Sequence, residues 1–140
     1  MNNVSEKFLA WGHLNIRATN RSTIELTREE SLTPSGDCVV GVAAEKACRN
    51  LSEPLKRTLS RSEARVYICL TCGGEEDTIL ARGDRRLSLD SEICMVIRKS
   101  SYICERTLAV GANKAARDLS RSLVERLKEG KRLIVKIEVI

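Results

Sequence analysis

Aromatic residues are scarce in this chain of 140 residues, which has one Phe, two Tyr and one Trp. The chain therefore offers few aromatic side chains on which nucleic-acid bases could stack. Long apolar runs are also missing, and the longest, such as residues 133–135, are far too short to span a bilayer. The N-terminal segment has no basic start followed by an apolar stretch, so we expect no signal peptide, no membrane partner and a cytoplasmic location.

Phosphate-binding glycine motifs are missing too, because Gly73 and Gly74 lack the spacing of a P-loop or of a dinucleotide fingerprint. The formal net charge of +5 is spread evenly, with ten basic and eight acidic residues in positions 1–70 and fourteen and eleven in positions 71–140. A dedicated nucleic-acid arm would concentrate its charge. The composition therefore favours a globular protein with a solvated, ion-paired surface.

Six cysteines are many for a cytosolic chain, where they are expected to stay reduced. Hyperthermophile proteins are the exception, and the high charge content is compatible with a thermophile. The spacing Cys69-x-x-Cys72 lacks two further ligands nearby, so we expect no metal and no cofactor. Cys94 and Cys104 would face each other across a predicted hairpin, which makes them the better disulfide candidates.

The strongest organisational signal is an internal repeat. Residues 46–55 (KACRNLSEPL) and 114–123 (KAARDLSRSL) are identical at six of ten positions, at an offset of 68. Weaker matches upstream join residues 39–42 to residues 109–112. Two amphipathic helices can share Ala, Arg and Leu by composition alone, but the matches in the flanking strands favour duplication.

Alternation of β-branched residues indicates strands, and the longer segments rich in Ala and Leu indicate helices. The expected strands are residues 6–11, 22–27, 38–42, 65–70, 78–82, 93–98, 102–110 and 133–140, and the expected helices are residues 43–59 and 113–128. The strands at 93–98 and 102–110 should form a hairpin. Ser52 and Pro54 should interrupt the first helix, because proline is tolerated in a first turn after a serine cap.

These elements do not alternate strand and helix. They predict an α+β fold with a mainly antiparallel curled sheet or a closed β-barrel, and two helices outside it or at its ends. We predict a single domain over residues 1–140 made of two tandem repeats, about 1–62 and 63–140, related by a pseudo-twofold axis. Neither repeat is long enough to fold alone.

The candidate catalytic residues are His13, Asp37 and Cys38. His13 is the only histidine and follows a predicted strand, where it could act as a general base. Cys38 would be the nucleophile, with Asp37 orienting the imidazole. The alternatives remain open: a structural histidine, an Asp that bonds its own turn, and a cysteine that packs in the core.

A second candidate site is basic. Arg17 and Arg21 flank a strand, and Arg82, Arg85 and Arg86 occupy the matching place in the second repeat. If the repeats are symmetric, these arginines could meet on one surface and bind phosphate. The alternative is an ordinary solvated face.

The segments 12–19 (GHLNIRAT) and 32–42 (LTPSGDCVVGV) resemble a small, mainly archaeal family known only as domain of unknown function three-seven-one. The resemblance extends down to residues 113–119 and implies a stand-alone archaeal domain without an assigned activity. In that family a second His usually follows the Ala-Thr pair, where this chain has Asn20, so a two-histidine site does not carry over. The matching positions that do carry over are His13, Asn15, Asp37 and Cys38.

Three functions follow from these patterns. The first is a binding module for a small ligand or nucleic acid that uses the loops around His13 and Asp37, with Asn15, Arg17 and Arg21 as ligand-binding residues. Its partner would be an unknown ligand such as RNA or a phosphate-containing molecule. The second is an enzyme with a Cys38, His13 and Asp37 site. The third is an interaction protein that forms a homodimer.

Overall fold

The strands form two four-stranded sheets in the computed structural model, which describes residues 3–140. Sheet A is antiparallel, with the order β1 (Val4–Trp11), β8 (Arg132–Val139), β4 (Arg65–Cys72), β5 (Glu75–Arg82). Sheet B is mixed, with the order β3 (Val39–Gly41), β2 (Thr23–Thr27), β6 (Cys94–Arg98), β7 (Thr107–Ala109). The fold is therefore α+β, as the sequence predicts.

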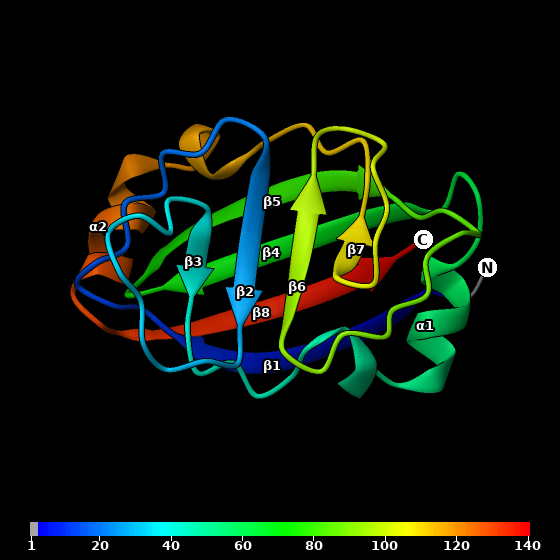
Figure 1. Ribbon diagram of the computed structural model, residues 1–140, viewed down its shortest axis with the longest axis horizontal. Helices are drawn as coiled ribbons and strands as arrows, with labels where there is room; N and C mark the ends of the chain where they lie inside the picture. The colour runs from blue at the N-terminus through cyan, green and yellow to red at the C-terminus, as the bar shows by residue number, and fades with distance from the viewer. Residues whose placement is uncertain (1–2) are drawn as a thin grey trace.

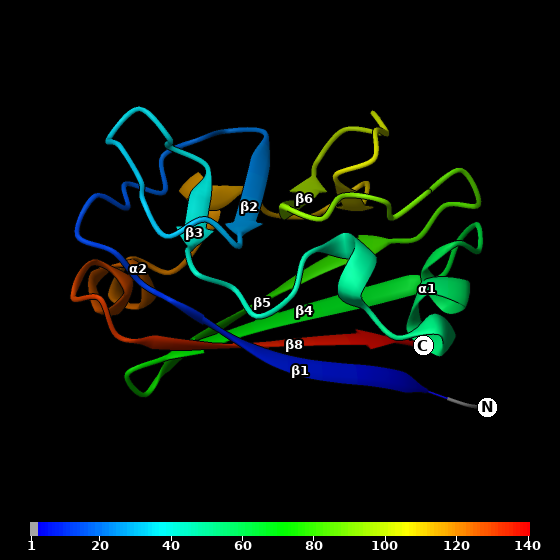
Figure 2. The same cartoon turned by 60° about the horizontal axis from the view of Figure 1, so that its bottom comes forward.

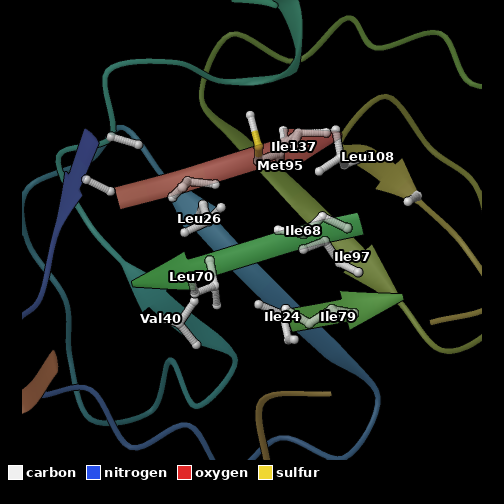
Figure 3. Packing of buried hydrophobic residues seen from close by; sticks show 14 of the residues in the cluster. Ile24, Leu26, Val40, Ile68, Leu70, Ile79, Met95, Ile97, Leu108 and Ile137 are labelled. Carbon is white, nitrogen blue, oxygen red and sulfur yellow. The ribbon is translucent and has the colours of Figure 1, made fainter. Parts of the chain in front are cut away.

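The two sheets stack face to face, and the strands of sheet B cross those of sheet A at a steep angle (Figures 1 and 2). Alternate residues of each strand point into the space between the sheets. Leu26 and Ile97 from sheet B meet Ile68 and Ile137 from sheet A there (Figure 3), and all four are fully buried. This apolar layer is the core, and it leaves the other face of each sheet for polar residues.

The two helices lie at opposite ends of the molecule (Figure 1). α1 (Glu53–Leu59) packs against β1 and β8, and α2 (Arg121–Lys128) packs against β4 and β5. Ser52 caps α1 by accepting a hydrogen bond from the Leu55 amide at 3.3 Å, and Pro54 lies in the first turn, as predicted. Among residues 3–140 no helix is long and apolar enough to span a membrane.

Both helices are shorter than the sequence pattern indicated. Residues 43–47 and 113–115 are not helical, and a short 3-10 turn precedes each helix: η1 (Cys48–Asn50) and η2 (Ala116–Asp118). The side chains of Asn50 and Asp118 accept hydrogen bonds from the amides of Ala47 and Ala115, which closes each turn on itself. Continuous helices were wrong because these local bonds compete with helical ones.

Two further predictions need correction. The strands of residues 3–140 do not close into a barrel, because only single bridges, from Trp11 to Val42 and from Arg82 to Val110, join the edges of the two sheets. The hairpin of residues 93–98 and 102–110 is also wrong, because β6 and β7 pair in parallel. The loop between β6 and β7 must therefore reverse the chain twice. Cys104 lies in this loop and is not the strand partner of Cys94.

Gly12 and Gly83 mark the points where sheet A meets the helices. A β-carbon at Gly12 would lie 2.0 Å from the Leu127 carbonyl oxygen at the end of α2. A β-carbon at Gly83 would lie 2.2 Å from the carbonyl oxygen of Leu59 at the end of α1. Glycine is required at both places because backbone approaches backbone too closely for any side chain.

Candidate functional site

The loops that the sequence singled out lie side by side near the α2 end of the molecule. Asn15 donates its side-chain amide to the Leu32 carbonyl at 2.7 Å, and the Asn20 side chain donates to the Asp37 carboxylate at 3.1 Å. Arg17 reaches the Pro34 carbonyl at 3.5 Å. These polar groups therefore hold the loop after β1 against the loop after β2, so their observed role is structural.

His13 does not join Asp37 or Cys38. Its amide donates to the Leu127 carbonyl at 2.9 Å, and its Nδ1 atom accepts from the Asn15 amide at 3.0 Å. None of the hydrogen bonds formed by residues 3–140 links the imidazole to the other two candidates. Asp37 is instead bonded to Asn20, and Cys38 to Glu25.

The arginines at the two ends do not share a surface. The loop that carries Arg17 and Arg21 begins at the amide contact with Leu127 of α2, and Arg21 is exposed. The corresponding loop with Arg85 and Arg86 begins at the contact between the Asp84 amide and Leu59 of α1. Since the helices lie at opposite ends (Figure 1), the two basic loops do too.

The thiol of Cys38 is a poor nucleophile in this fold. Burial raises its pKa, and the neighbouring Glu25 carboxylate, whose Oε1 atom accepts from Sγ at 3.5 Å, raises it further to about 11. The group is thus protonated at neutral pH, and the thiolate is the reactive form of cysteine.

Cys104, in the loop between β6 and β7, has the opposite environment. The Arg98 guanidinium donates to its sulfur through Nη2 at 3.4 Å, and the Thr107 hydroxyl lies 3.9 Å from the sulfur. The Thr107 oxygen already accepts hydrogen bonds from Arg98 Nε at 2.9 Å and from the Cys104 amide at 3.0 Å. With both lone pairs occupied, its single proton is left to point at the sulfur.

Neighbouring side chains fix Arg98 in this position. Its guanidinium lies 4.9 Å from the centre of the Tyr102 ring, a cation–π contact, while its Nε atom is held by Thr107. Arg106, two residues beyond Cys104, also lowers the pKa of the Cys104 thiol. One guanidinium and one hydroxyl therefore contact the sulfur atom, and a second arginine lies two residues away in the sequence.

These contacts set the charge of the Cys104 thiol. Burial by itself raises the pKa, but the hydrogen bonds from Arg106, Thr107 and Arg98 outweigh burial and lower the pKa to about 7. About half of the molecules then carry a thiolate at neutral pH. Cys104 is half-buried, so the sulfur is within reach of a small reagent.

Two more thiols lie beside Arg106. Cys48 donates to the Arg106 carbonyl at 3.5 Å, and Cys94 and Arg106 line the same cavity. Burial, with the nearby Cys94 and Cys104, raises the pKa of Cys48 to about 12, and burial also raises that of Cys94. We call Cys48, Cys94 and Cys104 the thiol cluster. It combines one thiol of lowered pKa with two thiols of raised pKa.

A cavity of about 450 Å³ opens on the outer face of sheet B, next to the thiol cluster. Its lining includes Cys94, Arg106 and Glu25, together with the carboxylates of the loop before β6. Within residues 3–140, no group of three or more His, Cys, Asp and Glu side chains is arranged to hold a metal ion. The cysteine that lines this cavity is Cys94, and Cys104 lies just outside it, next to the lining residue Glu105.

Sequence reasoning missed Cys104 because it assigned this cysteine to a hairpin disulfide. All six cysteines are free thiols in the structure. The signal that could have found it is composition: Cys104 lies between Arg98 and Arg106, and cationic surroundings lower a thiol pKa. Thr107, three residues beyond Cys104, reaches the sulfur through the local turn that its amide closes on the Cys104 carbonyl at 3.0 Å, whereas the parallel pairing of β6 and β7 brings Arg98 to both.

Fold and site define an α+β protein of two stacked sheets, with a cysteine of lowered pKa in the loop between two strands of sheet B. Comparison with protein-family models matches residues 8–140 to a domain of unknown function, DUF371, so the chain belongs to that family, as the sequence resemblance predicted. An uncharacterised protein of the archaeon Methanocaldococcus jannaschii is 45% identical over 130 residues, which is 93% of this chain and 96% of the relative.

Proposed function

We propose that this protein is a redox-responsive thiol protein in which Cys104 reacts with small hydroperoxides. The observation that carries the proposal is the Thr107 hydroxyl, which has both lone pairs occupied by Arg98 and the Cys104 amide and so directs its proton at the sulfur. Exposed thiolates with a resolving thiol nearby are the cysteines most readily oxidised by peroxides.

The reaction balances without a metal or a cofactor. The Cys104 thiolate attacks one oxygen of the peroxide, an S–O bond forms, and the O–O bond breaks. The sulfur is oxidised by two electrons to a sulfenic acid, while the leaving hydroxide or alkoxide takes a proton from water. The sulfenic acid then condenses with a second thiol to give a disulfide and water. Cys94 and Cys48, which flank Arg106, are the candidate second thiols.

The test is to treat the reduced protein with hydrogen peroxide and trap sulfenic acid with a dimedone probe, followed by peptide mass spectrometry. We expect Cys104 to be modified first, and C104S to lose the fast phase. C38S is the matched control, because its thiol has a pKa of about 11 and should not contribute. Oxidation of Cys38 at a rate equal to or above that of Cys104 would overturn the proposal.

The pH dependence of alkylation shows whether Cys104 reacts because its thiol pKa is lowered or only because its sulfur is accessible. Alkylation of Cys104 by iodoacetamide should have a midpoint near the thiol pKa of about 7. Thr107→Val keeps the shape of the side chain but removes the donor, so the midpoint should rise and the rate at neutral pH should fall roughly fivefold. A midpoint that stays at the value of an ordinary thiol in the parent protein would contradict an activated Cys104.

We also propose that the chain is a tandem duplication. Exchanging β1–β4 for β5–β8 leaves the strand order of both sheets unchanged, which supports the proposal. So do paired contacts at equivalent positions: Lys46 with Glu6, and Lys114 with Asp77. The boundary between the units would then fall at the turn after β4 rather than near residue 62, because β4 is the counterpart of β8.

The duplication bears on the site because the thiol cluster has no copy in the other half. The repeat offset of 68 places Gly36 opposite Cys104 and Cys38 opposite Arg106, and Val39 takes the place of Thr107. The two halves thus agree in their strand order and differ at this surface. Loss of symmetry at one surface is expected where only one copy performs chemistry. We further propose a cytoplasmic location, where free thiols stay reduced.

A further inference from the structure

The outer face of sheet A points away from sheet B and from the core (Figure 2). It is formed by the alternate residues of β1, β8, β4 and β5 whose side chains do not enter the core. Trp11 is 43% exposed and Leu80 is 40% exposed on this face. These two apolar side chains lie on the two edge strands, β1 and β5, and leave polar and charged side chains to cover most of the face between them.

Five cations lie on this face, which also carries the carboxylates of Glu138 and Glu76, and four of the cations are paired across strands with like charges. Lys7 lies directly opposite Lys136 on the neighbouring strand, and Arg65 lies directly opposite Arg82. Like charges in directly opposite positions destabilise a sheet. A fifth cation, Arg132, lies opposite Trp11. None of these five cations takes part in an ion pair in the part of the chain that the structure describes.

The spread of these cations fits a polymer rather than a single anion. Arg132 and Lys136 are four residues apart on β8, and Lys136 pairs with Cys69, which is four residues from Arg65 on β4. At about 3.3 Å per residue the cations extend over roughly 26 Å. One phosphate group cannot contact both ends, whereas successive phosphates of a chain can.

Two hollows on this face supply surfaces for bases. One, of about 570 Å³, is lined by Arg65, Tyr67, Leu80 and Arg82 among others. The other, of about 380 Å³, includes Lys7, Leu9, Arg132 and Ile134. Each joins apolar or aromatic side chains to cations, which is the combination that single-stranded nucleic acids use for stacking and phosphate contact.

We propose that the outer face of sheet A binds single-stranded nucleic acid, with Lys7, Lys136, Arg65, Arg82 and Arg132 on phosphates and Trp11 and Tyr67 against bases. A second copy of this chain fits the face poorly, because a twofold interface there would bring the same cations together. This proposal is independent of the chemistry at Cys104, which lies in the loops of the other sheet.

The test measures binding of a fluorescent single-stranded RNA of about 12 nucleotides by anisotropy over a range of salt concentrations. The double variant K7Q/K136Q should bind roughly tenfold more weakly and lower the slope of log affinity against log salt by about 1.4, since each lost phosphate contact contributes about 0.7. W11A should also weaken binding, by about tenfold, through loss of stacking.

The matched control is R57Q/R85Q, which removes the same net charge from exposed positions outside sheet A. K7Q/K136Q should melt no lower than the parent, because it removes a repulsion, and should keep the parent rate of Cys104 alkylation. If the control weakens RNA binding as much as K7Q/K136Q does, the proposal is overturned. It is equally overturned if the parent binds no RNA, or if it binds only vesicles of anionic lipid or only a second copy of itself.

Discussion

At the scale of single residues, Asp77 shows how one carboxylate fixes a long-range contact. It accepts from Lys114 and, at 2.8 Å, from the Ser120 amide that precedes α2. Burial alone raises its pKa, but the bonds from Lys114 and Ser120 outweigh burial and lower it below the ordinary value of 3.8. The folded state therefore prefers the ionised carboxylate.

Because the folded-state pKa of Asp77 is lowered, its contribution to stability is present above 3.8 and is lost as the pH falls through the lowered value. We expect D77N to reduce the free energy of unfolding by about 1 kcal/mol at neutral pH. The difference from the parent should vanish in acid below the lowered pKa. Urea unfolding at both pH values measures this, with D90N, at an exposed loop carboxylate, as the control. An equal loss in acid and at neutral pH would contradict the account.

Cysteine is a second example at this scale. One of the alternatives that the sequence leaves open is an enzyme with Cys38 as its nucleophile, next to Asp37. The structure places Cys38 beside a carboxylate and Cys104 beside two arginines, which separates their pKa values to about 11 and about 7. Arg106 is a near neighbour of Cys104 in the sequence, whereas Glu25 reaches Cys38 from β2 and Arg98 reaches Cys104 from β6, and these two contacts depend on how the strands pair.

At the scale of elements, the end of β1 is held against the end of α2. The Gly12 amide donates to the Lys131 carbonyl and the His13 amide donates to the Leu127 carbonyl, at 2.8 and 2.9 Å. The sequence marks Gly12 and His13 as a site, whereas the structure assigns Gly12 a steric role at this junction.

A methyl group at Gly12 would collide with backbone rather than with a flexible side chain. G12A should therefore lower the free energy of unfolding by about 2 kcal/mol or more, as should G83A at the α1 junction. Thermal and urea denaturation measure the effect, and S88A, at an exposed loop position, serves as the control. If G12A has the same melting temperature as the parent, then the close approach of strand and helix does not require glycine at this position.

At the scale of the whole molecule, the two halves depend on each other. β1 has one neighbour in sheet A, and that neighbour is β8 from the far end of the chain. β4 lies between β8 and β5, so the two central strands of sheet A, β8 and β4, come from different halves of the chain. Removing either half exposes the core of the other.

Separate chains of residues 1–73 and 74–140 should therefore not fold as monomers, and mixing them should restore a folded complex. Circular dichroism and size-exclusion chromatography test this, with the intact chain as the reference for the cooperative transition. A half that melts cooperatively as a monomer would show that its own contacts suffice.

The sequence by itself determined the α+β class, the positions of most strands, the serine cap of α1 and the family. These depend on alternation, propensity and local hydrogen bonds, which neighbouring residues decide. Tertiary structure alone decided that the strands form two sheets and that β6 and β7 pair in parallel, which brings Arg98 to Cys104. The physical reason is that strand pairing depends on groups distant in sequence, whose meeting is set by burial of the shared core.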